Sequence, residues 1–493
     1  MRQRFEQQLA LGQVPIDQVH IPTTSRDELP PVLRGLQWIF QTPEVNEQIF
    51  ALLETKVIGT KQATGRPGMD LWQILVLGVV RLALDCDYDR LSYLVHYDKL
   101  LRQLLGLESA FTCREPLGRT TGDFGKQFHH KTLSDNVRHV DAALLQEINA
   151  IVVQAGRPLL KKNAAEPLRV KSDTYVLETN VHFPTDLNLL WDACRKCILL
   201  VQPLSEEVEH PGWRKYKTWL KQVKARFRRC GQIQHGGGVN TQERFEQAVR
   251  HYLQRASDLE QKVEASLHAL QGMALTDGQR CTLDKVEYFH EMLVTHLDLI
   301  ERRVLRGETI PHDEKLFSLC EPHTEWIQKG KLRPAVELGH KLLVTTDQYG
   351  LVLDYKVMDH TSDVSETIPL VDRLLARYGD DQIQSFSVDK GLSAQQDREL
   401  LELYIPEVIM PKKGRRTHAE QARETHKAFR HLRRKHSAIE SDIHCLEAHG
   451  LNRCPDKGLH GFTRYVGFGM LAYNLHKIGN QLIARPVQLK RAA

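Results

Sequence analysis

The chain has 493 residues, of which 41% are hydrophobic and 26% are charged, and its formal net charge is +5. These values are typical of an ordinary soluble globular protein of about two to four domains. No stretch reaches the roughly 18 apolar residues that a membrane-spanning helix needs, and the first residues lack the apolar core of a signal peptide. We therefore expect a cytoplasmic protein without a membrane partner.

The cysteines and glycines exclude several further classes. Nine scattered cysteines, an odd number, argue against a disulfide framework. Cys194 and Cys197 form one CxxC pair, but a structural zinc would need a second pair of ligands, so two thiols on a helix is the better interpretation. No GxxxxGK[ST] loop is present, and we therefore expect no nucleotide cofactor.

Residues 1–160 are expected to form a helical N-terminal domain. Asp70 can cap the apolar helix that begins at Leu71, and spaced leucines from Leu91 to Leu105 continue a helical pattern. Short helices joined by tight turns suit a helix-turn-helix that reads DNA ends. They suit any small helical bundle equally well.

From residue 168 onward, β-branched and aromatic residues indicate strands that alternate with helices. The expected elements are a strand or hairpin at 168–183, strands at 340–346 and 351–357, a helix at 367–378, a strand at 383–389, a helix at 394–404, a strand at 408–410 and a basic helix at 419–449 that Gly450 stops. This order predicts an α/β fold with a mixed sheet and helices on both faces. The core would comprise 165–203 and 315–480, with a helical insertion at 204–314 and a basic tail at 481–493.

Two aspartates are expected to lie on the strands of this sheet. Asp173 falls within the first strand, and Asp389 falls at the end of a later strand, just before a glycine turn. Sites in open α/β sheets form outside the strand ends, so Asp389 is well placed to reach a ligand. Each aspartate alone is weak evidence for a site, because an aspartate at the end of a strand is more often a turn or cap residue.

Glu440 lies beside the apolar stripe of the basic helix. Arg433, His436, Glu440, His444 and Glu447 form a second row at near-helical spacing, which we expect to point along the sheet edge. The alternative is a solvated face with charge pairs at i,i+4 spacing. Three carboxylates on two strands and a helix can converge, and such hard oxygen ligands suit Mg²⁺ or Mn²⁺. Two such ions support in-line phosphoryl transfer.

Two segments concentrate positive charge. Residues 213–229 contain eight basic residues and no acidic one, with Trp213, Tyr216, Trp219 and Phe227 interleaved, whereas residues 412–435 contain ten basic residues and two acidic ones. Basic side chains neutralise phosphates, and aromatic faces can stack on unpaired bases. For the first segment, an amphipathic helix with its aromatics in a core is an equal alternative. The candidate DNA-binding residues are Lys412, Lys413, Arg415, Arg416, Arg430, Arg433, Arg434, Lys215, Lys217 and Arg228.

Several stretches together resemble the DDE transposases of bacterial insertion sequences, close to the ISNCY-type members. They are 172–186, 327–340, Ser387-Val-Asp-Lys-Gly-Leu392, His436-Ser-Ala-Ile-Glu-Ser441 and 461–475. The resemblance implies an RNase H-like core that binds two Mg²⁺ (or Mn²⁺) ions, cleaves transposon ends and joins the 3′-hydroxyl to target DNA. Asp173, Asp389 and Glu440 match the three catalytic, metal-binding positions. A homodimer or higher homo-oligomer on DNA, associated with the bacterial nucleoid, is also expected.

The chain departs from the family pattern near two of these positions. Asp173-Thr-Tyr stands where similar enzymes often have Asp-Gly-Thr, and His436 and Glu447 stand where related groups carry Arg and Lys. Glu447 is therefore a rival third carboxylate, and Lys390, His436 and Glu447 are secondary site candidates. A catalytically inactive or domesticated DNA-binding protein, and an RNase H-like nuclease without joining activity, remain the alternative functions.

Overall fold

The computed structural model describes residues 2–5, 14–59, 68–107, 128–163, 166–312, 314–328 and 335–492, with side chains in the last helix described up to residue 484. It divides into two compact units, Met1–Asn180 with Ile327–Ala493, and Val181–Trp326. Part of the stretch 327–340, which contributed to the family resemblance, lies outside the described residues.

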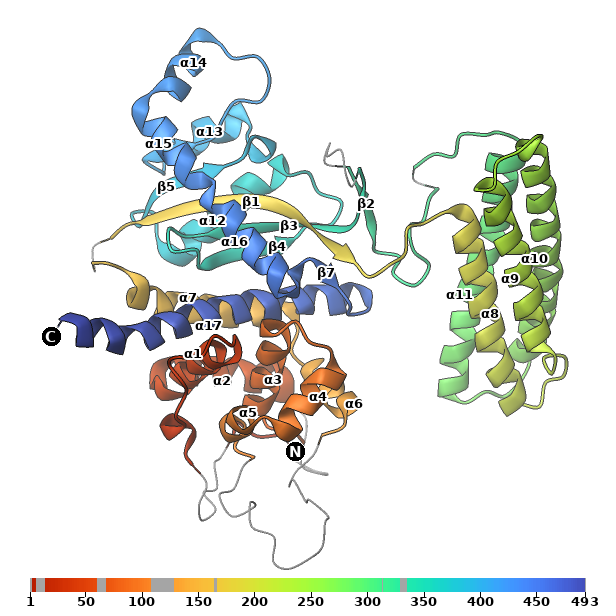
Figure 1. Cartoon of the computed structure of the whole chain (residues 1–493), viewed down its shortest axis with the longest axis horizontal. Helices are drawn as coiled ribbons and strands as arrows, with labels where there is room; N and C mark the ends of the chain where they lie inside the picture. The colour runs from red at the N-terminus through yellow and green to blue at the C-terminus, as the bar shows by residue number, and fades with distance from the viewer. Residues whose placement is uncertain are drawn as a thin grey trace, which may run out of the picture. The chain divides into compact units, whose positions relative to one another are not determined.

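A seven-stranded mixed sheet forms the centre of the first unit (Figure 1). Its order is β2-β3-β1-β5-β6, while β4 pairs with β3 and β7 pairs with β1. The strands are β1 (Leu168–Thr179), β2 (Glu325–Ile327), β3 (Glu337–Thr346), β4 (Val352–Val357), β5 (Ile383–Val388), β6 (Glu407–Ile409) and β7 (Arg453–Cys454). β1 is antiparallel to β3 and parallel to β5. The predicted α/β class with a mixed sheet is confirmed.

Helices flank both faces of this sheet. α12 (Thr367–Tyr378) lies on the face that carries Asp354, because Arg373 and Arg377 bind this carboxylate at 2.8 and 3.4 Å. α15 (Lys427–His436) and α16 (Ala438–Leu446) lie on the opposite face, and α16 crosses β1 (Figure 1). Cross-strand partners share a face of a sheet, and successive residues along a strand point to opposite faces. The strand residues that each set of helices contacts therefore place the two sets on opposite faces.

The long helix α17 (Gly458–Ala492) joins the sheet to the N-terminal helices. These helices are α1 (Leu29–Gln41), α2 (Pro43–Leu53), α3 (Leu71–Ala83), α4 (Tyr88–Tyr97), α5 (Lys99–Leu104), α6 (His130–Val137) and α7 (Ala142–Leu160). Two glycines, which lack a Cβ atom, allow α1 and α3 to approach α17 closely. Gly35 faces the Leu475 carbonyl of α17, and Gly78 faces the Phe468 ring. The N-terminal helices therefore share one hydrophobic core with the sheet. Residues 481–484 continue α17 as helix where a tail was expected.

The second unit is a bundle of long helices with its own hydrophobic core. The helices are α8 (Asp186–Glu207), α9 (Tyr216–Gln234), α10 (Thr241–Gln271) and α11 (Asp277–Ile300). This unit is wider than the expected insertion at 204–314, because α8 packs with α9 and α11. Cys194 and Cys197 lie on α8 in this core, where burial raises the pKa of both thiols.

No helix in the described part of the chain is both long and apolar enough to cross a membrane.

The turn between β3 and β4 requires glycine at its end. Gly350 has φ +75°, and a Cβ there would overlap Asp442 Oδ1 and Lys477 Nζ. We expect Gly350→Ala to lower the free energy of unfolding of the first unit by about 2–4 kcal/mol, since it combines backbone strain with a steric clash. Urea denaturation measures this loss.

Gly391→Ala is the matched control for the turn variant. Gly391 has no positive φ, and its Cβ would lie 3.5 Å from the nearest atom, an ordinary contact. We expect its denaturation midpoint to stay close to that of the unchanged chain. Equal midpoints for Gly350→Ala and Gly391→Ala would contradict the requirement for glycine at the turn.

Candidate active site

Asp173 and Asp389 lie at adjacent register positions of two neighbouring parallel strands. Lys171 on β1 is the register partner of Ser387 on β5, and the two strands are parallel. Asp173 lies two residues beyond Lys171, and Asp389 follows the last residue of β5. Because side chains alternate along a strand, Asp173 shares the face of Lys171. Asp173 is half-buried, Asp389 is exposed, and Asp173 Oδ1 accepts a hydrogen bond from the Thr174 amide.

The basic helix expected at 419–449 is wrong as a single element. It forms α14 (His418–Thr425), α15 and α16. The break after α14 occurs at His426, whose ψ of 140° is extended. Gly450, with φ +89°, lies at the end of the last turn, as predicted. The break allows α15 and α16 to lie on the sheet, which a single straight helix through α14 would not.

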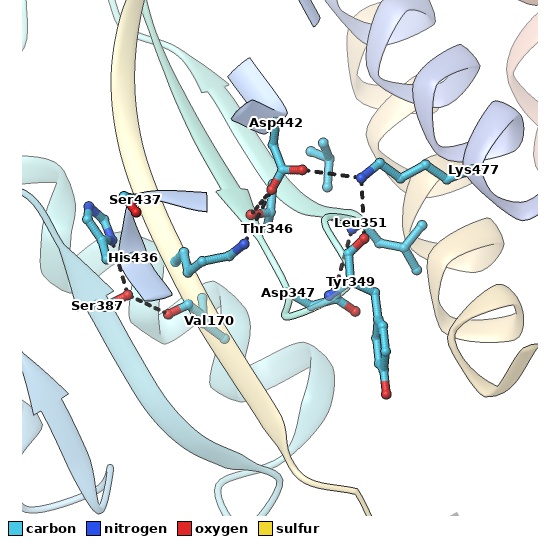
Figure 2. A network of polar contacts seen from close by, with 12 residues as sticks. Val170, Thr346, Asp347, Tyr349, Leu351, Ser387, His436, Ser437, Asp442 and Lys477 are labelled. Carbon is cyan, nitrogen blue, oxygen red and sulfur yellow. Dashed lines mark hydrogen bonds and ion pairs between the residues drawn. The ribbon is translucent and has the colours of Figure 1, made fainter. Parts of the chain in front are cut away.

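The end of α15 is fixed over β5 by His436. Its Nδ1 forms a hydrogen bond of 3.1 Å with Ser387 Oγ (Figure 2). Burial lowers the pKa of His436 to about 4, while nearby Asp389 acts in the opposite direction and Lys171 adds to the lowering. The imidazole is therefore neutral near pH 7 and lies in the electrostatic field of Asp389.

Glu440 follows His436 by one helical turn and has an exposed side chain. Farther along the chain, Glu447 is close enough to Tyr175 of β1 to help raise the pKa of that phenol, although burial is the main cause. Along the chain, Glu440 therefore lies between His436, which is bonded to Ser387 of β5, and Glu447, which lies near Tyr175 of β1.

The three carboxylates offer the ligand atoms that a divalent ion prefers. Aspartate and glutamate oxygens suit Mg²⁺ and Mn²⁺, and no soft ligand belongs to this set. Their ligand atoms do not all lie within 4.8 Å of one another in the described structure. The donor chemistry thus fits a hard cation, while closer approach of Asp173, Asp389 and Glu440 would be needed to share one ion.

A second carboxylate on α16, Asp442, was not predicted from the sequence. It is 8% exposed and contacts β1, β3 and α17 (Figure 2). A signal for it does exist in the sequence, because Asp442 interrupts the apolar stripe between Ile439 and Ile443. A charged residue within such a stripe indicates a buried partner.

An arginine-rich hollow lies beside the start of α16. Its volume is about 500 Å³, and its lining residues are Arg416, Gln421, Glu424, Thr425, Arg430, Arg433, Arg434 and Ser437. Arg416 pairs with Glu424 at 3.0 Å, whereas Arg430, Arg433 and Arg434 are exposed. This surface can accept an anion larger than a single carboxylate.

Other predicted basic residues of this region have different surroundings. Lys412 donates to Glu420 at 2.8 Å, and that contact is the main reason why the pKa of Glu420 falls to about 2. Lys413 and Arg415 are exposed in the loop before α14, and Lys390 is exposed directly after Asp389. Lys412 therefore stabilises the fold of this loop.

The aromatic residues of 213–229 pack on neighbouring helices, as the alternative interpretation of this segment expects: Trp213 is buried, and Tyr216, Trp219 and Phe227 are half-buried. The Trp213 indole donates to Ser266 Oγ at 2.9 Å, and the Arg255 guanidinium lies 3.7 Å from the Trp219 ring centre. Phe227 stacks on Trp191. The physical reason is amphipathic packing of this segment on the core of the second unit. Its basic residues, including Lys215, Lys217 and Arg228, remain exposed.

Comparison with known proteins finds one family model that matches part of the chain. Residues 306–475, about a third of the chain, match the family model for the transposase DDE domain. Asp389 and Glu440 lie inside this match and Asp173 lies before it. The match supports a DDE transposase family and an enzyme of the transposase or nuclease type. No curated protein and no solved structure matches the chain.

Proposed function

We propose that this chain is an insertion-sequence transposase, similar to the ISNCY-type members, that cleaves the ends of its element and joins the 3′-hydroxyl to target DNA. The observation that carries this proposal is the adjacent register of Asp173 on β1 and Asp389 after β5, with Glu440 one helical turn after His436, which is bonded to β5. Asp173 lies on β1, Asp389 follows β5, and Glu440 lies on α16, a helix that packs on this sheet. Two of them lie in the part of the chain that matches the transposase DDE domain.

In this proposal Asp173, Asp389 and Glu440 hold two divalent ions, Mg²⁺ or Mn²⁺. Such ions activate the attacking oxygen and stabilise the leaving oxygen of an in-line phosphoryl transfer. The three side chains would fix the position of these ions relative to the sheet. The neutral imidazole of His436 places no positive charge beside Asp389 that would compete with a bound cation.

The DNA backbone would bind along the arginine-rich hollow next to Glu440. Guanidinium groups bind phosphate oxygens in a bidentate manner, and such contacts position DNA without reading its sequence. The exposed basic face of α9 is a second backbone site in this proposal. Recognition of the ends belongs to the N-terminal helices, and a homodimer would hold two ends together.

The proposal is tested with purified protein and labelled end DNA in Mg²⁺ and in EDTA. Nicking and joined products that require the metal ion support transposition. Nicking without joining of pre-cut ends would favour the RNase H-like nuclease. Tight DNA binding with no metal-dependent product would favour the catalytically inactive or domesticated DNA-binding protein.

Replacing the three exposed arginines of the hollow should weaken DNA binding in a salt-dependent way. For Arg430→Gln, Arg433→Gln and Arg434→Gln combined, we expect the slope of log K against log salt to fall by about 0.9 for each lost phosphate contact. Binding titrations from low to moderate salt measure this slope. The loss should be similar for unrelated DNA sequences, because backbone contacts carry no sequence information.

A charge-matched control removes three exposed cations from helices of the second unit. Arg250→Gln, Arg280→Gln and Lys285→Gln change the net charge by the same amount, at positions to which we assign no DNA contact. We expect this triple variant to retain the original salt slope. Equal slopes for the two triple variants would mean that net charge, and not the hollow, governs DNA binding.

A further inference from the structure

Asp442 is a buried carboxylate on the helix that carries Glu440. It lies on α16 between the buried residues Ile439 and Ile443, and it is 8% exposed. A charged group in such a place is costly unless its oxygen atoms are hydrogen-bonded and its charge is paired. Its contacts therefore decide how α16 sits on the sheet.

Four side chains donate to the two oxygen atoms of Asp442, and Figure 2 labels Thr346 and Lys477 among them. Oδ2 accepts from Lys171 Nζ of β1 at 3.3 Å and from Thr346 Oγ1 of β3 at 3.1 Å. Oδ1 accepts from the Tyr473 hydroxyl at 3.1 Å and from Lys477 Nζ at 3.2 Å, both on α17. One carboxylate thus joins α16 to two strands and one helix.

The β3–β4 turn is shaped around this cluster. Gly350 leaves the space that Asp442 Oδ1 and Lys477 Nζ occupy. Lys477 Nζ also donates to the Tyr349 carbonyl at 3.3 Å. At the β3 end of the turn, the strand register shifts between Thr345 and Thr346, next to the hydroxyl that binds Asp442. The turn, the strand end and the helix therefore depend on the same carboxylate.

The cluster connects two segments that carry proposed metal ligands. Asp442 lies two residues after Glu440, so the two side chains project from nearly opposite sides of α16. Lys171 lies two residues before Asp173 on the same face of β1. The ion pair between Lys171 and Asp442 therefore fixes the helix segment of Glu440 against the strand segment of Asp173.

We propose that Asp442 is the positioning residue for Glu440, because it fixes α16, the helix that carries Glu440, against β1, β3 and α17. This inference rests on the proposed function for the role of Glu440. The attachment of α16 itself does not depend on that function. The four donors hold the helix through both oxygen atoms of Asp442, which restrains its rotation as well as its distance from the sheet.

The test compares Asp442→Asn with the unchanged full-length protein by two measurements. Amide hydrogen exchange of residues 438–446 reports whether α16 remains attached to the sheet. Titration with Mn²⁺ without DNA reports the preorganisation of the carboxylates. We expect faster exchange in this segment and Mn²⁺ affinity lower by about 10- to 100-fold, the usual effect of losing a partner that orients metal ligands.

Asp347→Asn is the matched control, because Asp347 is a fully buried carboxylate in the same region. It accepts hydrogen bonds from the Tyr349 and Leu351 amides at 2.9 Å and so caps the turn. If Asp442 acts only through general stability, both variants will change exchange and Mn²⁺ affinity alike, and the proposal is overturned. Unchanged exchange of α16 in Asp442→Asn also overturns it.

Two milder variants keep the test decisive if Asp442→Asn does not fold. Thr346→Val and Tyr473→Phe each remove one hydrogen bond to Asp442, and each should give an intermediate increase in α16 exchange. Absence of any increase in both overturns the proposal. If the unchanged protein binds no Mn²⁺, the proposed function fails, and the exchange measurements alone decide the role of Asp442.

Discussion

Asp389→Asn should reduce metal-dependent DNA cleavage and joining by about 10³-fold or more while leaving DNA affinity within a few-fold. The reason is that the substitution removes a proposed metal ligand without changing the size of the side chain. Loss of several kcal/mol of transition-state stabilisation by a metal corresponds to a rate decrease of this order. Single-turnover cleavage of labelled end DNA in Mg²⁺ measures the rate, and a binding titration in EDTA measures the affinity.

Asp381→Asn is the control for charge and strand context. Asp381 is exposed just before β5, at the end of the strand opposite to Asp389. Its replacement by asparagine changes the net charge by the same amount as Asp389→Asn. We expect it to cleave at nearly the original rate. Equal activity of the two variants would remove Asp389 from the proposed site. A parallel loss of cleavage and DNA binding in Asp389→Asn would instead indicate misfolding or a binding role.

Most of the sheet could be predicted because its strands have clear local signals. The hairpin of β3 and β4 and the helix α12 were predicted within a few residues, since turn residues and β-branched runs mark their ends. The single helix at 419–449 was not correct. No proline or glycine marks a break between residues 419 and 449, and the extended conformation of His426 separates α14 from α15.

The parts that the sequence could not define depend on contacts between distant segments. Nothing local to residues 1–160 shows that α1 and α3 pack on α17, because the glycines that permit it look like ordinary helix residues. The donors around Asp442 lie on β1, β3 and α17, so only the folded chain brings them together. The aromatics of 213–229 show the same limit, since stacking on DNA and packing in a core need the same residue types.

Glu440→Gln and Glu447→Gln form a pair of variants that identifies the third carboxylate. We expect Glu440→Gln to reduce cleavage by about 10³-fold, and Glu447→Gln to reduce it by less than about tenfold. The difference follows from their surroundings: Glu440 is exposed one turn after His436, which is bonded to β5, whereas half-buried Glu447 lies near Tyr175. Single-turnover cleavage in Mg²⁺ measures both variants.

Each of these two variants is the control for the other, because both remove one negative charge seven residues apart on the same helical row. The reverse order of activities would assign the third metal ligand to Glu447, and the site would then extend along β1 toward Tyr175 instead of toward the end of β5. Nearly full activity in both variants would separate cleavage from this helix altogether. Only selective loss in Glu440→Gln agrees with a site that combines Glu440 with Asp173 and Asp389 while Asp442 anchors the opposite side of the helix.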